Sequence, residues 1–360
     1  MKKKLHLVYA IPKISKKWSL LNRIVRKLTG NELYYYSYKF LDWNSPISAP
    51  YSITFNICKK LNRKFKIRLY SIFDNRNLIL NNNDLFLGHP WPDFKDYQNG
   101  NNSWKSYDTN QITNKLILKY PNDKRVFIIC PFNHSLEQIG WIEPLLSNIS
   151  NFVALSGDIW VNTFKDFPLF EKFKNVYNIN MSLDQKHYPF IKKDFNKKGE
   201  RKFLYIGRLS KEKNIKLLEQ LASRIENFKG GFISDGDLIK GWHKISAFTD
   251  LNPEFMKKIA LEYDVFINAS DFDAQATTIL EAMSWGFMIL CTNQTGYIHD
   301  SIFELKLHDE IFNINIIHKI QNMDDLNLKK IQNTNLNLLK NKYSWNVFSD
   351  KLQSILKNYN

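Results

Sequence analysis

Asn-Ala-Ser-Asp-Phe-Asp-Ala-Gln-Ala-Thr-Thr-Ile-Leu-Glu-Ala-Met-Ser-Trp-Gly-Phe-Met-Ile-Leu-Cys-Thr-Asn-Gln-Thr-Gly occupies residues 268–296. The β-branched and aromatic run at 264–267 predicts a short buried strand that leads into this stretch. A helical period begins at Ala276 and ends at Gly286, and the apolar run 287–292 predicts a second buried strand. The stretch is therefore a strand–helix–strand unit, which is typical of a parallel sheet covered by helices.

Two carboxylates mark this unit, Asp273 in the loop and Glu281 about one and a half turns into the helix. At ~1.5 Å of rise per residue they lie on the order of 9 Å apart along the axis. The helix N-terminus lies between them, and its free N–H groups bind anions. We interpret the spacing as a site for a diphosphate, with a sugar at one carboxylate and a ribose at the other. The alternative is an amphipathic helix with a solvated Glu281.

Length and composition bound the class of protein. A chain of 360 residues suits two domains, and a hydrophobic fraction of 44% suffices for their cores. Three isolated cysteines, without metal-ligand spacing, indicate a reducing compartment and no disulfide framework. The first apolar run is too short for a signal peptide and predicts a strand at 4–10. No apolar run approaches the roughly 20 residues of a membrane span, so we expect a cytoplasmic protein.

The net charge of +16 is concentrated near the N-terminus, where residues 1–70 hold 16 Lys or Arg and two acidic residues. Two stretches there, 13–28 and 55–70, mix basic with apolar residues. In the first, helical spacing relates Trp18, Leu21, Val25 and Leu28. Such stretches favour an anionic membrane surface as partner. Solvated helix faces are one alternative. Nucleic acid is another, although no recognised binding motif accompanies the charge.

The N-terminal half alternates strand-like runs with polar or helical stretches, which predicts a parallel sheet covered by helices. The runs are 67–73, 84–88, 126–131 and 151–156. Residues 93–114 predict a surface loop or insertion. His89 and His134 end predicted strands, where α/β sheets place ligands, so both are candidate site residues. The alternative for each is a structural histidine.

A second alternation follows a predicted polar linker at 184–200. The expected elements are strands at 202–206 and 230–234 and helices at 215–228 and 256–263. Arg208 and Lys213 flank the first strand-to-helix turn. A guanidinium fork and an ammonium both suit phosphate oxygens, so this turn is a second candidate anion site. The alternative is an ordinary basic turn.

Together these residues resemble a family. The C-terminal half is similar to the donor domain of retaining GT-B glycosyltransferases of the glycogen-synthase and mannosyltransferase type, family four. The resemblance covers about residues 178–358, half of the chain, and the N-terminal half shares only the alternation of strands and helices. The matching motifs are Tyr-Ile-Gly-Arg-Leu-Ser-Lys-Glu-Lys-Asn (205–214), the Asp273/Glu281 spacing with Glu-Ala-Met-Ser-Trp-Gly (281–286), Thr-Gly-Tyr (295–297) and Tyr-Ser-Trp-Asn-Val-Phe (343–348).

The resemblance implies two Rossmann-like domains that face a central cleft. The first, 1–180, would bind the acceptor, and a last helix at 343–360 would pack back on it. The second, 184–342, would bind a nucleotide-diphosphate sugar.

The resemblance also assigns roles to single residues. Arg208 and Lys213 would hold the diphosphate, with Gly207 in the same turn, and Glu281 would bind the ribose hydroxyls. Asp273 would lie beside the transferred sugar, and His134 would approach it from the acceptor side. His89 stays a candidate substrate contact because of its place at a strand end, not because of the resemblance. Backbone N–H groups at the helix start would meet sugar and phosphate, and they belong to Ala274, Gln275, Ala276, Thr277 and Thr278.

Two positions depart from the family pattern. The family usually has Glu where this chain has Asp273, followed by Gly-x-Gly where this chain has Ala-Gln-Ala. It also often has a glycine-rich loop after the first strand, where this chain has Ala-Ile-Pro-Lys at 10–13. The sugar pocket and the contacts of the first loop are therefore expected to differ.

The expected activity is transfer of a sugar from a nucleotide-diphosphate donor to a glycan or lipid-linked glycan, with retention of configuration. We expect cell-surface polysaccharide synthesis, no metal, no cofactor, and a place in the cytoplasm, resting on the inner membrane face. One alternative is a metal-dependent transferase of the GT-A fold, using Asp271-Phe-Asp273 or Asp235-Gly-Asp237. Others are a non-enzymatic basic binder of nucleic acid or membrane through residues 1–70, and a sugar-nucleotide isomerase or phosphorylase on the same fold.

Overall fold

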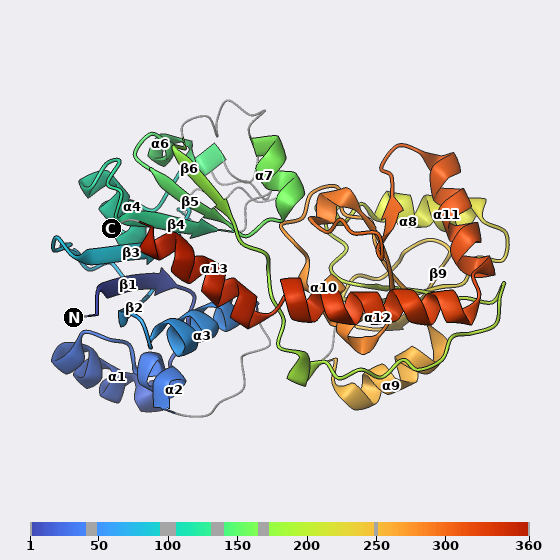
Figure 1. Cartoon of the computed structure of the whole chain (residues 1–360), viewed down its shortest axis with the longest axis horizontal. Helices are drawn as coiled ribbons and strands as arrows, with labels where there is room; N and C mark the ends of the chain where they lie inside the picture. The colour runs from blue at the N-terminus through green and yellow to red at the C-terminus, as the bar shows by residue number, and fades with distance from the viewer. Residues whose placement is uncertain are drawn as a thin grey trace. The chain divides into compact units, whose positions relative to one another are not determined.

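The computed structural model describes residues 2–40, 49–93, 106–130, 140–164, 173–247 and 251–358. The chain divides into two compact units. The N-terminal unit contains Met1–Leu155, Val161–Ile179 and Trp345–Asn360, and the C-terminal unit contains Ser156–Trp160 and Asn180–Ser344. Each unit has its own sheet of parallel strands (Figure 1). Among the described helices, none has both the length and the apolar composition needed to cross a bilayer.

The sheet of the N-terminal unit has the strand order β2-β1-β3-β4-β5-β6, and every described pair is parallel. Its strands are β1 (Lys4–Tyr9), β2 (Lys66–Ser71), β3 (Asp84–Gly88), β4 (Val126–Cys130), β5 (Asn151–Ala154) and β6 (Asn175–Asn178). Its helices are α1 (Lys16–Thr29), α2 (Leu33–Phe40), α3 (Ala49–Leu61), α4 (Ile112–Lys119), α6 (Glu143–Leu146), α13 (Trp345–Lys357) and part of α7 (Asp158–Phe164).

The sheet of the C-terminal unit has the order β12-β11-β10-β7-β8-β9 and is also parallel. Its strands are β7 (Phe203–Ile206), β8 (Gly230–Ile233), β9 (Trp242–Ser246), β10 (Val265–Asn268), β11 (Met288–Thr292) and β12 (Phe303–Leu305). Its helices are α8 (Ile215–Arg224), α9 (Pro253–Glu262), α10 (Thr277–Trp285), α11 (Glu310–Asn322) and α12 (Asp325–Lys342).

Alternation along the strands builds a core on each face of the second sheet. Val265 and Ile267 of β10 point to one face, where they pack with Leu218 of α8 and Ile317 of α11. The intervening residues point to the other face, where α10 contacts β10, β11 and α12. Because helices cover both faces, the central strands are almost wholly apolar, and the sequence shows them as continuous hydrophobic runs.

The strand–helix–strand unit at 264–292 has the predicted form. β10 leads into the loop, α10 begins at Thr277, and β11 follows. Gly286 ends the helix with φ of 96°, and its N–H donates to the carbonyls of Ala282 and Met283. This left-handed conformation costs glycine least, which is why the helix stops there.

The structure corrects two expectations about polar stretches. In 55–70 the apolar side chains, such as Phe55, Ile57 and Leu69, are buried in the core, so this stretch contributes cations but no apolar face. The predicted linker at 184–200 is packed against the C-terminal unit. The side chain of Lys192 is buried there, 3.1 Å from Asp264 and 2.7 Å from the Ala260 carbonyl.

The predicted loop at 93–114 is described only in part. Residues 94–105 lie outside the described residues, and helix α4 already begins at Ile112, inside the expected loop. Gln111 caps the start of α4, because its side chain accepts a hydrogen bond from the Asn114 N–H.

The last helix belongs to the N-terminal unit. α13 packs on α3, and the Lys60 ammonium lies 2.6 Å from the Asn346 amide oxygen. The N-terminal unit is therefore built from both ends of the chain.

Candidate functional site

Most of the predicted C-terminal site residues follow the carboxyl ends of neighbouring strands. Gly207 and Arg208 come directly after β7, Asp273 follows β10, and the motif 295–297 follows β11. β7, β10 and β11 are adjacent and parallel, so these ends meet at one edge of the sheet. Ligands in open α/β sheets bind at this kind of edge.

Lys213 and Asp273 form an ion pair between the loops after β7 and β10. The Asp273 backbone is held from two sides. Its N–H donates to the Gln294 carbonyl at 2.9 Å, and its carbonyl accepts from the Trp160 indole at 2.6 Å. The predicted phosphate cation and the predicted sugar carboxylate are thus ion-pair partners.

The Arg208 side chain is 78% exposed, and its one ion pair in the described residues is to Glu212, at 3.3 Å. Its backbone is anchored, because the buried Tyr205 hydroxyl donates to the Arg208 carbonyl at 2.6 Å. Gly207 is needed beside it, since a Cβ there would lie only 2.8 Å from that hydroxyl. The turn is therefore fixed while the guanidinium stays available to a ligand.

The Glu281 side chain is half-buried in densely packed surroundings, unlike the solvated residue of the alternative interpretation. Burial raises its pKa to about 7, although hydrogen bonds from Tyr188 and Thr277 act in the opposite direction. Ser284, three residues further along α10, is buried and donates to the Tyr188 carbonyl. The polar face of α10 is thus turned toward the segment around Tyr188. An acid that titrates near neutral pH in such surroundings is a candidate functional group.

Tyr297, in the Thr-Gly-Tyr motif, links Asp273 to Glu281. Its fully buried hydroxyl donates to the Ala276 carbonyl at 3.1 Å. Burial raises the pKa of Tyr297, and the nearby charges of Asp273 and Glu281 raise it further. Burial likewise raises the pKa of Tyr205. The charge of Asp273 raises this pKa further, whereas the charge of Arg208 lowers it. Asp273 therefore acts on both tyrosines, together with Arg208 at Tyr205 and with Glu281 at Tyr297.

Gln275 stands at the middle position of the family's Gly-x-Gly and has a left-handed backbone, with φ of 58°. Its buried side chain makes three hydrogen bonds. The amide oxygen accepts from the Met181 N–H at 2.6 Å, and the amide nitrogen donates to Asn180 at 2.9 Å and to the Gly296 carbonyl at 3.2 Å. These bonds hold the loop before α10 against two other segments of the same unit.

The start of α10 has the features of an anion site. Its N-cap residue, Ala276, provides no side-chain hydrogen bond to the helix, so the first N–H groups are left for other partners. Ala274, Ala276, Thr277 and Thr278 are partly exposed, whereas Gln275 is buried.

His89 follows β3 in the N-terminal unit. Its Nδ1 lies 3.0 Å from the Ile129 carbonyl, and its ring lies between Tyr9 and Trp91. Burial lowers the pKa of His89 to about 4, against a smaller opposing effect of the hydrogen bond at Ile129. A neutral imidazole that donates through Nδ1 leaves Nε2 as an acceptor. The other predicted histidine, His134, lies outside the described residues.

Other residues of the site were not predicted. The Trp160 indole supports Asp273, and Tyr205 supports Arg208. Tyr188 donates to Glu281. Glu212 pairs with Arg208 and accepts from Ser210. Of these residues, only Glu212 could have been found from the sequence, because it stands four residues after Arg208. Trp160 is 113 residues away from its partner Asp273 and gives no local sequence signal.

The acidic pairs of the alternative interpretation do not form a cluster. The Asp237 side chain is fully exposed and lies 3.6 Å from Lys244, while Asp273 is paired with Lys213. Burial raises the pKa of Asp271, and a hydrogen bond with Asn214 lowers it. Within the described ranges, no group of three His, Cys, Asp or Glu side chains could hold a metal ion.

Comparison by sequence finds no matching family model and no matching curated protein. Comparison by structure finds chains of the same architecture. An α-glucosyltransferase in complex with UDP-glucose and DNA containing an abasic site is 11% identical, with a TM-score of 0.55, covering 98% of both chains. A glycosyltransferase from Rickettsia africae ESF-5 is 14% identical, with a TM-score of 0.51, covering 99% of this chain and 98% of the other.

A third structure, Anabaena HepE in complex with UDP and glucose, is 11% identical, with a TM-score of 0.51, and the match covers 99% of this chain and all of the other. At these identities the likeness concerns the fold. The GT-A alternative required the other glycosyltransferase fold, so it is wrong. The chain has the GT-B fold, with two Rossmann-like units of six parallel strands each in the described ranges.

Proposed function

We propose that this chain is a glycosyltransferase that takes its sugar from a nucleoside-diphosphate donor bound to the C-terminal unit. The observation that carries the proposal is the placement of Arg208, Lys213 and Asp273 at one edge of the sheet in a GT-B fold, with Glu281 on α10 acting with Asp273 on the same residue, Tyr297. Two of the similar structures hold UDP or UDP-glucose, which supports a uridine nucleotide as the first donor to test.

The donor would lie along the strand ends. Glu281 would accept hydrogen bonds from the ribose hydroxyls, and Arg208, Lys213 and the free N–H groups of α10 would meet the diphosphate. Asp273 would lie beside the sugar. Lys213 would then be shared between Asp273 and the diphosphate, which positions the ammonium between the two parts of the donor.

Charge develops on the leaving diphosphate as the glycosidic bond breaks. Arg208, Lys213 and the helix N-terminus are pre-placed for that charge and would stabilise it most in the transition state. In the mechanism we propose, the acceptor attacks from the face that the diphosphate leaves, so that configuration is retained. No protein nucleophile, metal or cofactor takes part, because the two cations neutralise the leaving group.

The acceptor side belongs to the N-terminal unit in this proposal. We propose a glycan or lipid-linked glycan acceptor, with His134 approaching the reacting sugar and the neutral His89 as an acceptor of hydrogen bonds. A place in cell-surface polysaccharide synthesis, on the cytoplasmic face of a membrane, would follow from a lipid-linked acceptor. The basic N-terminal region supports this part of the proposal.

The decisive test is Arg208→Ala, assayed for release of UDP from a sugar donor found by thermal-shift screening of nucleotide sugars. A donor at 100-fold its Kd should stabilise the protein by ~2.7 kcal/mol. Removing one donor to a developing charge typically costs ~10²–10³ in rate, so we expect a loss of that order with an unchanged melting temperature.

Arg224→Ala is the matched control. Arg224 is an exposed arginine of the same unit, lies on α8 away from the strand ends, and pairs with Glu310. Near-normal turnover by Arg208→Ala, or an equal loss in both variants, would remove Arg208 from the proposed site. Failure of every nucleotide sugar to stabilise the protein would refute the donor assignment itself.

A further inference from the structure

Helix α1 of the N-terminal unit turns large apolar side chains outward. The exposed fractions are 49% for Trp18, 63% for Leu20, 40% for Leu21, 46% for Ile24 and 79% for Leu28. Within this described helix, Asn22 alone is buried. A surface helix normally directs its apolar stripe toward the core and its polar face toward water. α1 has the reverse arrangement, so its outer face is suited to contact with an apolar partner outside the protein.

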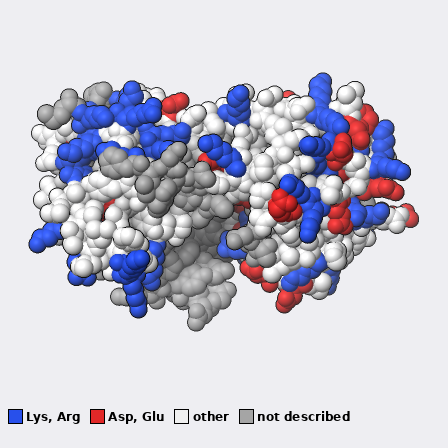
Figure 2. Space-filling view, turned by 90° about the horizontal axis from the view of Figure 1, so that it is seen from below, with Lys and Arg blue, Asp and Glu red and all other residues white. Residues whose placement is uncertain are grey.

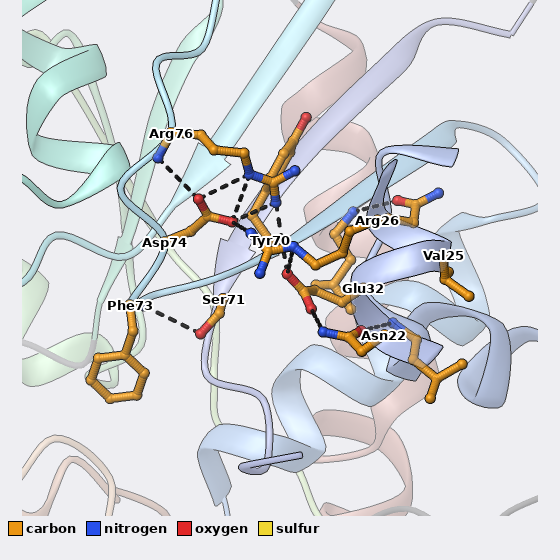
Figure 3. A network of polar contacts seen from close by, with 12 residues as sticks. Asn22, Val25, Arg26, Glu32, Tyr70, Ser71, Phe73, Asp74 and Arg76 are labelled. Atoms are coloured by element: carbon orange, nitrogen blue, oxygen red, sulfur yellow. Dashed lines mark hydrogen bonds and ion pairs between the residues drawn. The ribbon is translucent and has the colours of Figure 1, made fainter. Parts of the chain in front are cut away.

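Polar contacts fix α1 in this orientation. Asn22 donates to Glu32 at 2.9 Å and accepts from the Leu33 N–H at 2.7 Å. Arg26 lies 3.1 Å from Glu32 and 3.1 Å from Asp74 (Figure 3). Glu32 and Asp74 are buried, and Arg76 completes the network by pairing with both. The inner face of α1 is thus held by specific hydrogen bonds and ion pairs, which leave the apolar face outside.

The outer face has an ordered pattern. Leu20, Ile24 and Leu28 are four residues apart and form one row along the helix, with Leu21 beside it. Arg23 and Lys27, one position before Ile24 and Leu28, form a neighbouring basic row, to which Lys16 also belongs. α1 contains no acidic residue. An apolar stripe beside a cationic stripe is the pattern of helices that lie in the plane of a membrane interface.

The charge of the surrounding surface selects the partner. Residues 1–70 hold 16 Lys or Arg and two acidic residues, and of the latter Glu32 is buried. Figure 2 views the molecule from the side on which α1 and α2 lie in Figure 1, and the charged side chains that the N-terminal unit shows there are mostly basic. A second copy of this face would repel the first, and nucleic acid would leave the apolar row in water. An anionic lipid surface satisfies both the charge and the apolar row.

We propose that α1 docks in the plane of an anionic phospholipid bilayer. Leu20, Ile24 and Leu28 enter the boundary between headgroups and acyl chains, and Arg23 and Lys27 lie at the lipid phosphates. The inference rests on the membrane placement in the proposed function and deepens it, because it names the helix and the lipid class; it is independent of the transfer reaction, since docking of α1 needs no donor.

The test is flotation of the full-length protein with unilamellar vesicles of phosphatidylcholine alone, or with about a third phosphatidylglycerol. We expect binding to the anionic vesicles only. Leu20→Ser with Ile24→Ser should weaken it on the order of 100-fold, because two side chains no longer gain from burial. Arg23→Gln with Lys27→Gln should weaken it by about fivefold per cation, that is about 25-fold, at low salt.

The control is Leu261→Ser with Leu326→Ser, which removes from the C-terminal unit two leucines that are more exposed than Leu20 and Ile24, and it should bind like the parent. All these side chains are exposed, so the melting temperature should stay the same in each variant. If the serine variant of α1 proves unstable, the glutamine variant keeps the test open, because it changes charge alone.

Site-specific labelling reports insertion directly. The three cysteines are buried, so a surface cysteine introduced by Leu21→Cys can be labelled selectively with an environment-sensitive fluorophore. We expect a blue shift on adding anionic vesicles, and no shift for the same label placed by Leu326→Cys.

Three results would overturn the proposal. They are absence of parental binding to anionic vesicles, equal binding by the α1 serine variant, and a label at 21 that stays in water. A change of molar mass in light scattering for the serine variant, with vesicle binding unchanged, would instead assign the face to a second copy of the chain.

Discussion

Glu281 provides a pH-dependent test of the candidate site. Its pKa is raised to about 7 from an ordinary value of 4.5, chiefly by burial. The folded protein therefore holds this proton more tightly than the unfolded chain does. The contribution of Glu281 to stability is therefore fully present below pH 4.5 and is lost as the pH rises through about 7, where the carboxylate becomes charged. At ~1.36 kcal/mol per pKa unit, the cost at pH 8 is about 3 kcal/mol.

Glu281→Gln removes this ionisation and should abolish its pH dependence. The melting temperature of the variant, relative to the parent, should rise by several degrees between pH 5 and pH 8. A unit of this size shifts by about 2–4 °C per kcal/mol. The readout is the difference between the two proteins across pH, measured by circular dichroism, because glutamine also changes the hydrogen bonds to Tyr188 and Thr277. Parallel curves for variant and parent would show that the carboxyl titrates near its ordinary value, and that the burial argument is wrong.

The same pKa has a consequence for donor binding. If the ribose hydroxyls donate to the carboxylate, only its ionised form binds well, and at pH 6 that form is about a tenth of the total. The apparent Kd for UDP-glucose should then rise on the order of tenfold between pH 8 and pH 6, because the competent fraction falls. Both phosphates of this ligand are esterified and do not titrate in that range. Calorimetry would detect the change, and a pH-independent Kd would separate Glu281 from the ribose.

Two further predictions concern buried polar contacts. Gln275→Ala should destabilise the C-terminal unit by about 1–3 kcal/mol in urea unfolding, because it leaves the Met181 N–H unsatisfied. Gln275→Gly should cost about 1 kcal/mol less, since glycine accepts the positive φ; the opposite ranking would contradict this. Burial raises the pKa of Asp74, but the hydrogen bonds and the charge of Arg76 outweigh burial, so the pKa lies below its ordinary value of 3.8. The contribution of the Asp74 carboxylate to stability is therefore lost as the pH falls below 3.8. At pH 7 Asp74→Asn should cost about 2–4 kcal/mol, against about 1 kcal/mol or less for the more exposed Asp123→Asn, and equal losses would refute the role of burial.

Parallel topology explains why most strands could be predicted from the sequence. The expected runs at 84–88, 126–131 and 230–234 match β3, β4 and β8 to within one residue, because strands covered on both faces are continuous apolar runs. β9 was missed, since this edge strand carries the exposed His243 and the partly exposed Lys244. α11 and α12 were missed because asparagines interrupt their apolar spacing.

The candidate site could be predicted where its residues share one turn or one helix. Arg208 and Lys213 stand five positions apart, and Asp273 and Glu281 belong to one strand–helix unit. Contacts between distant segments gave no local signal. The support of Asp273 by Trp160 and the anchoring of α1 by Glu32 and Asp74 depend on tertiary folding, so they appear only in the structure.

The position of α13 has a consequence for how the protein is made. A chain emerges from the ribosome with its N-terminus first, and the N-terminal domain commonly folds before later ones. Here α13, which covers α3, is translated after the whole C-terminal unit. The second unit can therefore finish folding first, while the first waits with α3 uncovered. A released chain that ends just before Trp345 should yield a protease-resistant fragment from the second unit and a sensitive first unit.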